Sequence, residues 1–409
     1  MMQVSVRHLS WLILLCAFAM SGCSWFSKKT GNEPMELVDF KETLDLDKVW
    51  KRGIGEGQNK GFSSLTPALD GDAIYAVDYE GLIVAMNNQT GKKLWTRKVN
   101  KSQLGLWAWM KSFFVAGDPN RQIVGGIAAE NGLLLVATYA GEVMALSKDT
   151  GEELWRTQLP GEVVSAPRTN GIVVAAQTVN GKLFALNAKT GEQLWFYDSP
   201  PPILTLRGTP SPIVTDTAVY SGFSNGRMMA FNPANGLILW EQRVASPKGR
   251  SELERMVDIH SSPMIKDGVI YVGTYQGRIS ALARGTGKPL WGQDGSTSEN
   301  LALSDDGKLF VAHTDGKLVA YNATTGEQLW SNEKMLRRLL NGPQVFGNYV
   351  AVVDFKGYMH VVNQSDGEFV ARTKVDRKGA RAPMLTDGET LYVYTNSGKL
   401  IAFRAEKDK

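Results

Sequence analysis

Residues 81–95 read GLIVAMNNQTGKKLW, and weaker copies of this segment recur along the whole chain. A complete copy has a turn glycine, an alanine four residues later, a second glycine six residues after that, and then a tryptophan after four more. The turn glycines are Gly81, Gly141, Gly181, Gly226, Gly277, Gly316, Gly357 and Gly398. They are 39 to 60 residues apart. A period of this length, built from several short strands, is typical of propellers and related arrays.

One copy of the repeat contains four expected strands, at residues 65–69, 73–78, 82–87 and 92–99. Ile74, Tyr75 and Val77 are β-formers, and Asp70-Gly71 and Glu80-Gly81 supply turns between the strands. Glycine suits such turns because it tolerates a positive φ. Eight copies therefore predict an all-β fold, an eight-bladed β-propeller with four antiparallel strands per blade.

The eighth copy is incomplete, because the chain ends seven residues after Ala402, before any Thr-Gly-x-x-x-Trp segment. The missing piece lies at the other end of the chain, where Val49-Trp50-Lys51 resembles Leu94-Trp95-Thr96. We therefore expect an N-terminal strand around Trp50 to complete the last blade, so that residues 44–409 form one closed propeller without an open edge.

The repeated tryptophans are expected to act as wedges between neighbouring blades, because a buried indole brings a large apolar area to such an interface. They are Trp50, Trp95, Trp155, Trp195, Trp240, Trp291 and Trp330. One copy departs from the pattern, with Val361 in place of the alanine and Ala371 in place of the tryptophan. A residue that recurs in every unit serves the repeat and not one active site.

The N-terminus indicates export. Arg7 and His8 precede an apolar run over residues 9–20, which is too short to span a membrane and has signal-peptide character. The sequence Met20-Ser21-Gly22-Cys23 resembles a bacterial lipobox. We therefore predict a signal peptide at 1–22, a lipid on Cys23 and a tether at 23–43. An ordinary signal peptide followed by a chance cysteine is the alternative.

The residue after Cys23 is Ser24 and not aspartate, which in lipoproteins of this type implies sorting to the outer membrane. Cysteine usage fits this location. The only other cysteine, Cys16, lies in the predicted signal peptide, so the mature chain has no disulfide.

The chain shows no sign of catalysis, a metal site or nucleic-acid binding. It has 45 basic and 41 acidic residues, and the basic residues form no long run of the kind that binds nucleic acid. The histidines of the mature chain, His260, His313 and His360, are far apart and lack metal-ligand spacing. Asp305-Asp306-Gly307 falls where other copies have a turn. We therefore expect no enzyme activity, no cofactor and no metal.

Function should then lie in the connections between blades that depart from the repeat, at residues 100–126, 199–208 and 245–260. Links of this kind emerge on one face of a propeller, where binding loops on a rigid scaffold are common. The second and third connections mix apolar and charged groups, which suits a protein partner. These candidates are Leu204, Leu206, Arg207, Arg255 and Asp258.

An alternative is that Leu204 and Leu206 only pack their loop, and that Arg207 pairs with a nearby carboxylate. In the first connection the aromatic residues could likewise fold onto the propeller; they are Trp107, Trp109, Phe113 and Phe114.

The Ala-x-x-x-x-Thr-Gly-x-x-x-Trp repeat resembles that of pyrroloquinoline quinone propellers. With the lipobox, residues 20–403 resemble the BamB family of lipoproteins of the outer-membrane β-barrel assembly (BAM) complex. The local segments that carry the resemblance are 204–208 (LTLRG) and 252–258 (ELERMVD).

The resemblance implies a non-catalytic, periplasm-facing scaffold, anchored to the outer membrane only by its lipid. It would bind the POTRA domains of BamA through Leu204, Leu206, Arg207 and Asp258, and associate with other BAM lipoproteins. The family often has a second aspartate two residues after the first. Here that position is His260, which would make its contribution to binding pH-sensitive. Unfolded outer-membrane proteins are possible clients, which could add a strand to an outer edge such as residues 92–99.

Two rival hypotheses come from other classes of protein. A periplasmic quinoprotein would bind quinone and depend on calcium. A propeller that binds envelope glycans would use exposed aromatics such as Trp107 and Trp109. The segments after residues 199 and 245 favour the assembly role over both.

Overall fold

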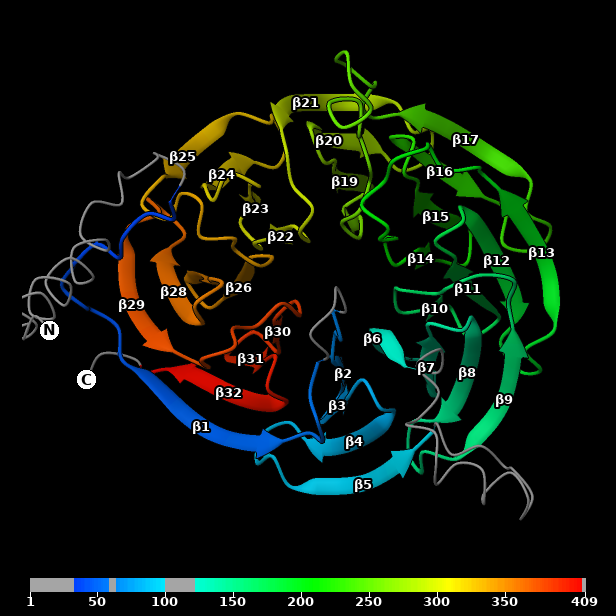
Figure 1. Cartoon of the computed structure of the whole chain (residues 1–409), viewed down its shortest axis with the longest axis horizontal. Coiled ribbons are helices and arrows are strands. Elements are labelled where there is room, and N and C mark those ends of the chain that lie inside the picture. The colour runs from blue at the N-terminus through cyan, green and yellow to red at the C-terminus, as the bar shows by residue number, and fades with distance from the viewer. Residues whose placement is uncertain (1–32, 59–63, 100–121, 407–409) are drawn as a thin grey trace, which may run out of the picture.

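The computed structural model describes residues 33–58, 64–99 and 122–406, and in these ranges every regular element is a strand. Eight sheets of four antiparallel strands are arranged around a ring (Figure 1). The predicted eight-bladed propeller is therefore confirmed. Cys23 and the aromatic residues of the 100–121 segment lie outside the described residues.

We number the blades along the chain. Blade 1 contains β2 (Ala68–Asp70), β3 (Ala73–Val77), β4 (Leu82–Asn87) and β5 (Lys93–Lys98), and blade 2 contains β6 (Ile123–Glu130), β7 (Leu133–Thr138), β8 (Glu142–Ser147) and β9 (Glu153–Gln158). Blade 3 contains β10 (Arg168–Thr169), β11 (Val173–Gln177), β12 (Lys182–Asn187) and β13 (Gln193–Asp198), and blade 4 contains β14 (Ile213–Val214), β15 (Val219–Gly222), β16 (Arg227–Phe231) and β17 (Ile238–Arg243). Blade 5 contains β18 (Met264–Lys266), β19 (Val269–Gly273), β20 (Gly277–Ala283) and β21 (Pro289–Gly295), and blade 6 contains β22 (Ala302–Leu303), β23 (Lys308–Ala312), β24 (Leu318–Asn322) and β25 (Gln328–Asn332). Blade 7 contains β26 (Gln344–Phe346), β27 (Tyr349–Val353), β28 (Tyr358–Asn363) and β29 (Phe369–Lys374). Blade 8 contains β30 (Leu385–Thr386), β31 (Thr390–Tyr394) and β32 (Lys399–Ala405), with β1 (Leu46–Gly53) as its outer strand.

The two middle strands of each blade form the core. In blade 1, β3 reads AIYAV and β4 reads LIVAMN, and nearly all of these side chains are buried. Neighbouring blades cover both faces of these strands, so both faces are apolar and no alternation appears. The outer strand β5 reads KLWTRK and is mostly exposed.

The two ends of the chain close the ring, as the sequence predicts. β1 lies beside β32 (Figure 1) and pairs with it antiparallel, so that Trp50 is opposite Ala402. Blade 8 therefore depends on strands from both ends of the chain, and no open edge remains between blades 8 and 1.

The tryptophan wedges make a second, polar contact. Trp155 donates its indole N–H to the carbonyl of Ala188 in the next blade at 2.8 Å. The glycine of that same turn, Gly191, has a φ of +74°, and a Cβ there would lie 2.5 Å from the Trp155 ring. The other six repeat tryptophans make the same pair of contacts, with donor–acceptor distances of 2.7 to 3.0 Å. Each repeated Trp therefore needs the glycine turn before the outer strand of the following blade.

The exception in blade 7 has a physical reason. Val361 and Ala371 are cross-strand partners, at the position where other blades pair Ala with Trp. The blade that follows is blade 8, whose third and outer strands, β32 and β1, come from opposite ends of the chain. No turn joins them, so a tryptophan at 371 would find no glycine to pack on. Instead, the N–H groups of Thr43 and Leu44 both donate to the carbonyl of Val370, at 2.9 and 3.2 Å.

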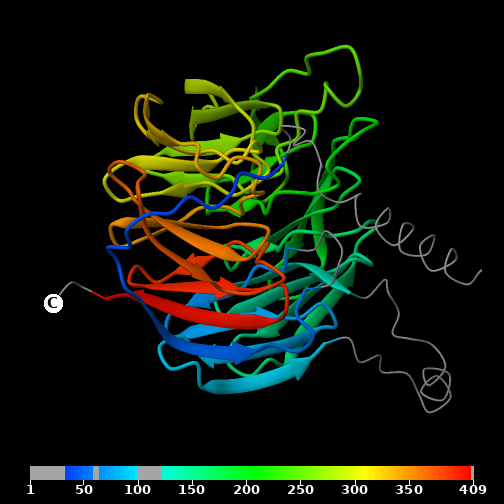
Figure 2. The same ribbon diagram turned by 60° about the vertical axis from the view of Figure 1, so that its left-hand side comes forward.

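Residues 33–44, here called the strap, run along the outside of blade 7 (Figure 2). Met35 donates its N–H to Leu336, in the link between blades 6 and 7, at 3.0 Å. Thr43, at the other end of the strap, lies beside the start of β29. The described part of the predicted tether therefore lies against the propeller.

The links between blades and the glycine turns between second and third strands share one face, here called the loop face. Backbone hydrogen bonds join the two within a blade, for example from the Val99 N–H to the Gly81 carbonyl at 3.0 Å in blade 1 and from the Val375 N–H to the Gly357 carbonyl at 2.9 Å in blade 7. The Thr-Gly turns lie on the opposite face.

Candidate partner-binding loops

Two links on the loop face carry the residues that the sequence singled out. Residues 199–212 connect β13 to β14, and residues 244–263 connect β17 to β18, on the side of the ring formed by blades 3 to 5 (Figure 1). Both links bring irregular backbone beyond the ends of the strands, where side chains are free to meet a partner.

Asp258 joins the two links. Its Oδ2 accepts the backbone N–H of Leu206 at 3.0 Å, and its own carbonyl accepts the N–H of Tyr275 at 2.9 Å. The residue is only 2% exposed. Its other oxygen, Oδ1, has no hydrogen-bond partner among the described residues. Burial raises the pKa of Asp258 to about 6, against the lowering effect of the Leu206 N–H. Asp258 therefore supports the surface from beneath and contributes little area to it.

The tip of the first link is apolar and exposed. Leu204 is exposed, Leu206 is half-buried, and Ile203 is 93% exposed. These side chains follow the stiff Pro200-Pro201-Pro202 run. An apolar group held out in solvent by a short rigid segment suits the core of a protein interface.

Arg207 occupies the end of this tip with a φ of +56°, a conformation that is unfavourable for residues other than glycine. Its Nη2 lies 3.4 Å from Oε2 of Glu162, which comes from the link between blades 2 and 3. The side chain of Arg207 is still 70% exposed. An exposed pair of this kind contributes about 0–1 kcal/mol, so the guanidinium is still available to a partner.

The second link is shaped by a capping box. Ser251 Oγ accepts the N–H of Glu254 at 3.3 Å, and the Glu254 carboxylate accepts the N–H of Ser251 at 3.2 Å. Hydrogen bonds from the Arg250 and Ser251 N–H groups lower the pKa of Glu254. The turn exposes Leu253 and Arg255. The following residues Met256, Val257 and Ile259 are buried, so the exposed tip stands on an apolar base.

His260 lies beside the first link. Its Nδ1 is 2.9 Å from the carbonyl of Ser298, and a Cβ on Gly208 would lie 1.9 Å from its Nε2. A carbonyl only accepts, so Nδ1 carries the proton and Nε2 faces Gly208. Burial lowers the pKa of His260, and the ring is therefore neutral at pH 7. It packs against the backbone at Gly208.

The structure thus gathers five of the six predicted partner residues, Leu204, Leu206, Arg207, Asp258 and His260, around one Asp258-to-Leu206 connection. Arg255 lies on the neighbouring turn. Sequence reasoning missed Ile203, although the preceding proline run signals a projecting segment. It also missed Glu162, for which the sequence holds no signal, because its role depends on the packing of adjacent links.

Within the described ranges, no group of three or more His, Cys, Asp or Glu residues could hold a metal ion. The same part of the chain has no helix long and apolar enough to cross a bilayer.

Comparison with known proteins places the chain in a family. The sequence model described as "Outer membrane protein assembly factor BamB" matches residues 43–105, 105–332 and 314–408. The chain belongs to the BamB family.

Individual BamB proteins match over nearly their whole length. The outer membrane protein assembly factor BamB of Pseudomonas aeruginosa is 39% identical over 98% of this chain and 99% of its own. The corresponding protein of Xanthomonas campestris pv. campestris is 33% identical, with 99% of both chains covered. The crystal structure of BamB from Moraxella catarrhalis superposes with a TM-score of 0.75 and 23% identity, over 88% of this chain and 100% of that one. That structure supports the fold.

Proposed function

We propose that this chain is a non-catalytic scaffold lipoprotein of the BAM complex, attached to the outer membrane by a lipid on Cys23 and facing the periplasm. It binds the POTRA domains of BamA through the loop face at blades 3 to 5, works beside the other BAM lipoproteins, and so assists the insertion of β-barrel proteins. Its membership of a family of outer membrane protein assembly factors supports this role.

One observation carries the assignment of the surface. The buried carboxylate of Asp258 accepts the Leu206 N–H and so fixes one long link against another. A preformed tip loses less conformational freedom when a partner binds. The exposed part combines apolar side chains with a guanidinium, which is the composition expected of an interface centre. Its members are Ile203, Leu204, Leu206 and Arg207.

The proposal is tested by measuring the affinity of the mature chain for the POTRA domains of BamA from the same organism. We expect Arg207→Ala to weaken binding at least tenfold, which corresponds to about 1.4 kcal/mol. Asp258→Ala should weaken it as well, because the Leu206 N–H loses its acceptor and the tip loosens. Arg97→Ala is the matched control, since Arg97 is exposed on β5 of blade 1.

A further variant separates this proposal from a purely structural role of Arg207. Glu162→Ala removes the ion-pair partner and leaves the guanidinium in place. If Arg207 contacts BamA, Glu162→Ala will keep or improve the affinity. If Arg207 only pairs within the chain, Glu162→Ala will reduce the affinity as much as Arg207→Ala. Absence of binding by the unmodified chain would refute the proposed partner.

A further inference from the structure

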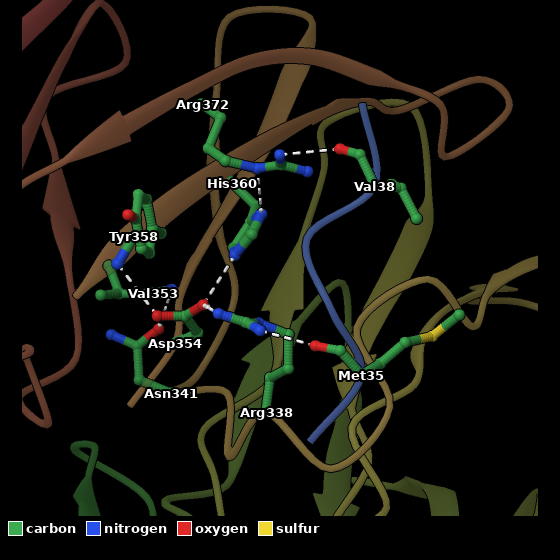
Figure 3. A network of polar contacts seen from close by, with 9 residues as sticks. All are labelled: Met35, Val38, Arg338, Asn341, Val353, Asp354, Tyr358, His360 and Arg372. Carbon is green, nitrogen blue, oxygen red and sulfur yellow. Dashed lines mark hydrogen bonds and ion pairs between the residues drawn. The ribbon is translucent and has the colours of Figure 1, made fainter. Parts of the chain in front are cut away.

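The strap leaves the propeller at a fixed place. Arg338 Nη1 donates to the carbonyl of Met35 at 2.7 Å, and Arg372 Nη1 donates to the carbonyl of Val38 at 2.8 Å (Figure 3). The Arg372 guanidinium also lies 4.8 Å from the centre of the Phe40 ring. Two arginines from blade 7 and its preceding link thus hold the backbone of the strap.

These arginines are themselves held by buried groups. Asp354 accepts Arg338 Nε at 2.8 Å, His360 Nε2 lies 3.1 Å from the same carboxylate, and Arg372 Nε donates to His360 Nδ1 at 3.2 Å (Figure 3). Arg338, Asp354 and His360 are almost completely buried. A fully bonded buried network defines one geometry, so the strap has one position on blade 7.

The N-terminal end of the strap lies at the loop face. The carbonyl of Glu33 accepts Arg337 Nε at 2.7 Å, and Arg337 belongs to the link between blades 6 and 7. Cys23 precedes Glu33 by ten residues. An extended chain of that length reaches about 35 Å at most. A lipid on Cys23 would therefore keep Glu33, at the edge of the loop face, within about 35 Å of the membrane.

The loop face is strongly basic there. One depression beside the links of blades 7 and 8 is lined by Lys374, Asp376, Arg377, Lys378, Ser397 and Lys399. Its one carboxylate, on Asp376, is buried and taken up by Lys399 Nζ at 2.7 Å and Ser397 Oγ at 2.6 Å. Arg377 and Lys378 are exposed, and neither has an ion pair among the described residues.

Exposed apolar groups lie next to these charges. Leu339, in the link between blades 6 and 7, and Phe355, in the turn between β27 and β28, are both exposed. The Phe355 N–H donates to the carbonyl of Arg338 at 3.1 Å, so this turn lies beside that link. Lys356 Nζ lies 5.7 Å from the centre of the Phe355 ring. Cations that flank a few protruding apolar side chains match the boundary between lipid headgroups and acyl chains.

We propose that the loop face of blades 7 and 8 is a contact surface for anionic phospholipid, formed by Arg377 and Lys378 with Lys356, Lys374, Leu339 and Phe355. It lies across the ring from the partner-binding loops of blades 3 to 5 (Figure 1). The propeller can therefore bind lipid at one side of this face and a protein at the other. The inference rests on the proposed lipid anchor for the direction in which the membrane lies.

The test uses the mature chain without its lipid, residues 24–409, which contains every described residue. Its partition onto phosphatidylcholine vesicles is compared with partition onto vesicles that contain about one third phosphatidylglycerol. We expect clear preference for the anionic vesicles and a loss of binding as salt is raised. Arg377→Gln with Lys378→Gln should lower the partition coefficient roughly thirtyfold, since each cation near the surface contributes about a factor of five.

The matched control is Lys92→Gln with Lys189→Gln, which removes the same charge from exposed turns on the opposite face. Equal losses in the two double variants would show a net-charge effect only and overturn the surface. So would absence of preference for anionic vesicles, or selective competition by inorganic phosphate over chloride at equal ionic strength, which would indicate a site for a small soluble anion.

POTRA binding by the Arg377→Gln, Lys378→Gln variant distinguishes this inference from the proposed function. We expect it to equal that of the unmodified chain. If the double variant loses POTRA binding and keeps vesicle binding, the basic surface is a protein interface and the lipid proposal is wrong.

Discussion

Two buried aspartates at the loop face have opposite environments. Asp354 begins the turn between β27 and β28 and accepts hydrogen bonds from Arg338, His360 and the Tyr358 N–H (Figure 3). Burial opposes its ionisation, but these donors lower the pKa of Asp354. Asp258, between blades 4 and 5, has one donor from another residue, the Leu206 N–H, and its pKa is raised to about 6.

The difference shows that the site around Asp354 stabilises the fold, whereas the buried charge of Asp258 destabilises it. The buried carboxylate of Asp354 is paired with Arg338 and accepts two further hydrogen bonds, and the result is a fixed strap. At Asp258 the fold keeps a buried carboxylate whose Oδ1 has no hydrogen-bond partner in the described ranges, which is unfavourable on its own. What this arrangement secures is the position of the 203–207 tip, in agreement with a binding role for that tip.

The largest expected effect on stability comes from removing the carboxylate of Asp354. Asp354→Ala leaves Arg338 buried without its carboxylate, and we expect the free energy of unfolding to fall by about 3–5 kcal/mol. Urea unfolding at pH 7 measures this. Asp294→Ala is the control, because its side chain is 91% exposed and 3.8 Å from Arg278. If both variants lose the same stability, the network around Asp354 is not what holds blade 7 together.

Asp258→Asn should have the opposite sign. The amide oxygen still accepts the Leu206 N–H, but no buried charge remains. We expect a gain of about 1–3 kcal/mol at pH 7, the upper end following from a pKa raised from 3.8 to about 6.

The pH dependence gives the decisive check. The folded state binds this proton more tightly than the unfolded state, so Asp258 destabilises the fold progressively as pH rises from about 4 to about 6. The gain from Asp258→Asn should therefore be full at pH 7 and absent near pH 4. A gain that is independent of pH would show that charge burial is not its cause.

A smaller effect tests the strap itself. Arg372→Lys keeps the charge but cannot reach both His360 and Val38, so we expect a loss of about 1–2 kcal/mol from two hydrogen bonds. Hydrogen exchange should also become faster at Leu44 and Met35. Lys374→Arg, an exposed position on the same strand, should change neither quantity. Unchanged exchange in Arg372→Lys would mean that the strap is held by its backbone bonds alone.

The propeller can be predicted from the sequence, but the environments of Asp354 and Asp258 cannot. Gly, Ala and Trp recur at fixed spacing because neighbouring blades pack against each other in the same way. The strands assigned to one copy of the repeat therefore predict those of the other copies. Even the exception at Ala371 is visible, although its cause, the absence of a turn between β32 and β1, requires the closed structure.

The candidate partner-binding loops are recognisable in the sequence by their departure from the repeat, which points to Leu204, Arg207 and Asp258. Their roles were not accessible in the same way. That Asp258 is buried beneath Leu206 depends on how two links 52 residues apart pack together. The sequence predicts a tether at residues 23–43, but the contacts of its described part with Arg338 and Arg372 are equally non-local.

The smallest effect on stability is expected at Arg207. Its φ of +56° favours glycine, and its ion pair with Glu162 is long and exposed. In Arg207→Gly the relief of backbone strain offsets the greater freedom of the unfolded chain, so unfolding should change by less than about 1 kcal/mol. Backbone strain at an arginine that adds so little to the fold agrees with the proposed contact between Arg207 and a partner. If Arg207→Gly instead lowered stability as much as Arg372→Lys, Arg207 would belong with the structural residues around Asp354, and the contrast between the two aspartates would no longer mark the partner surface.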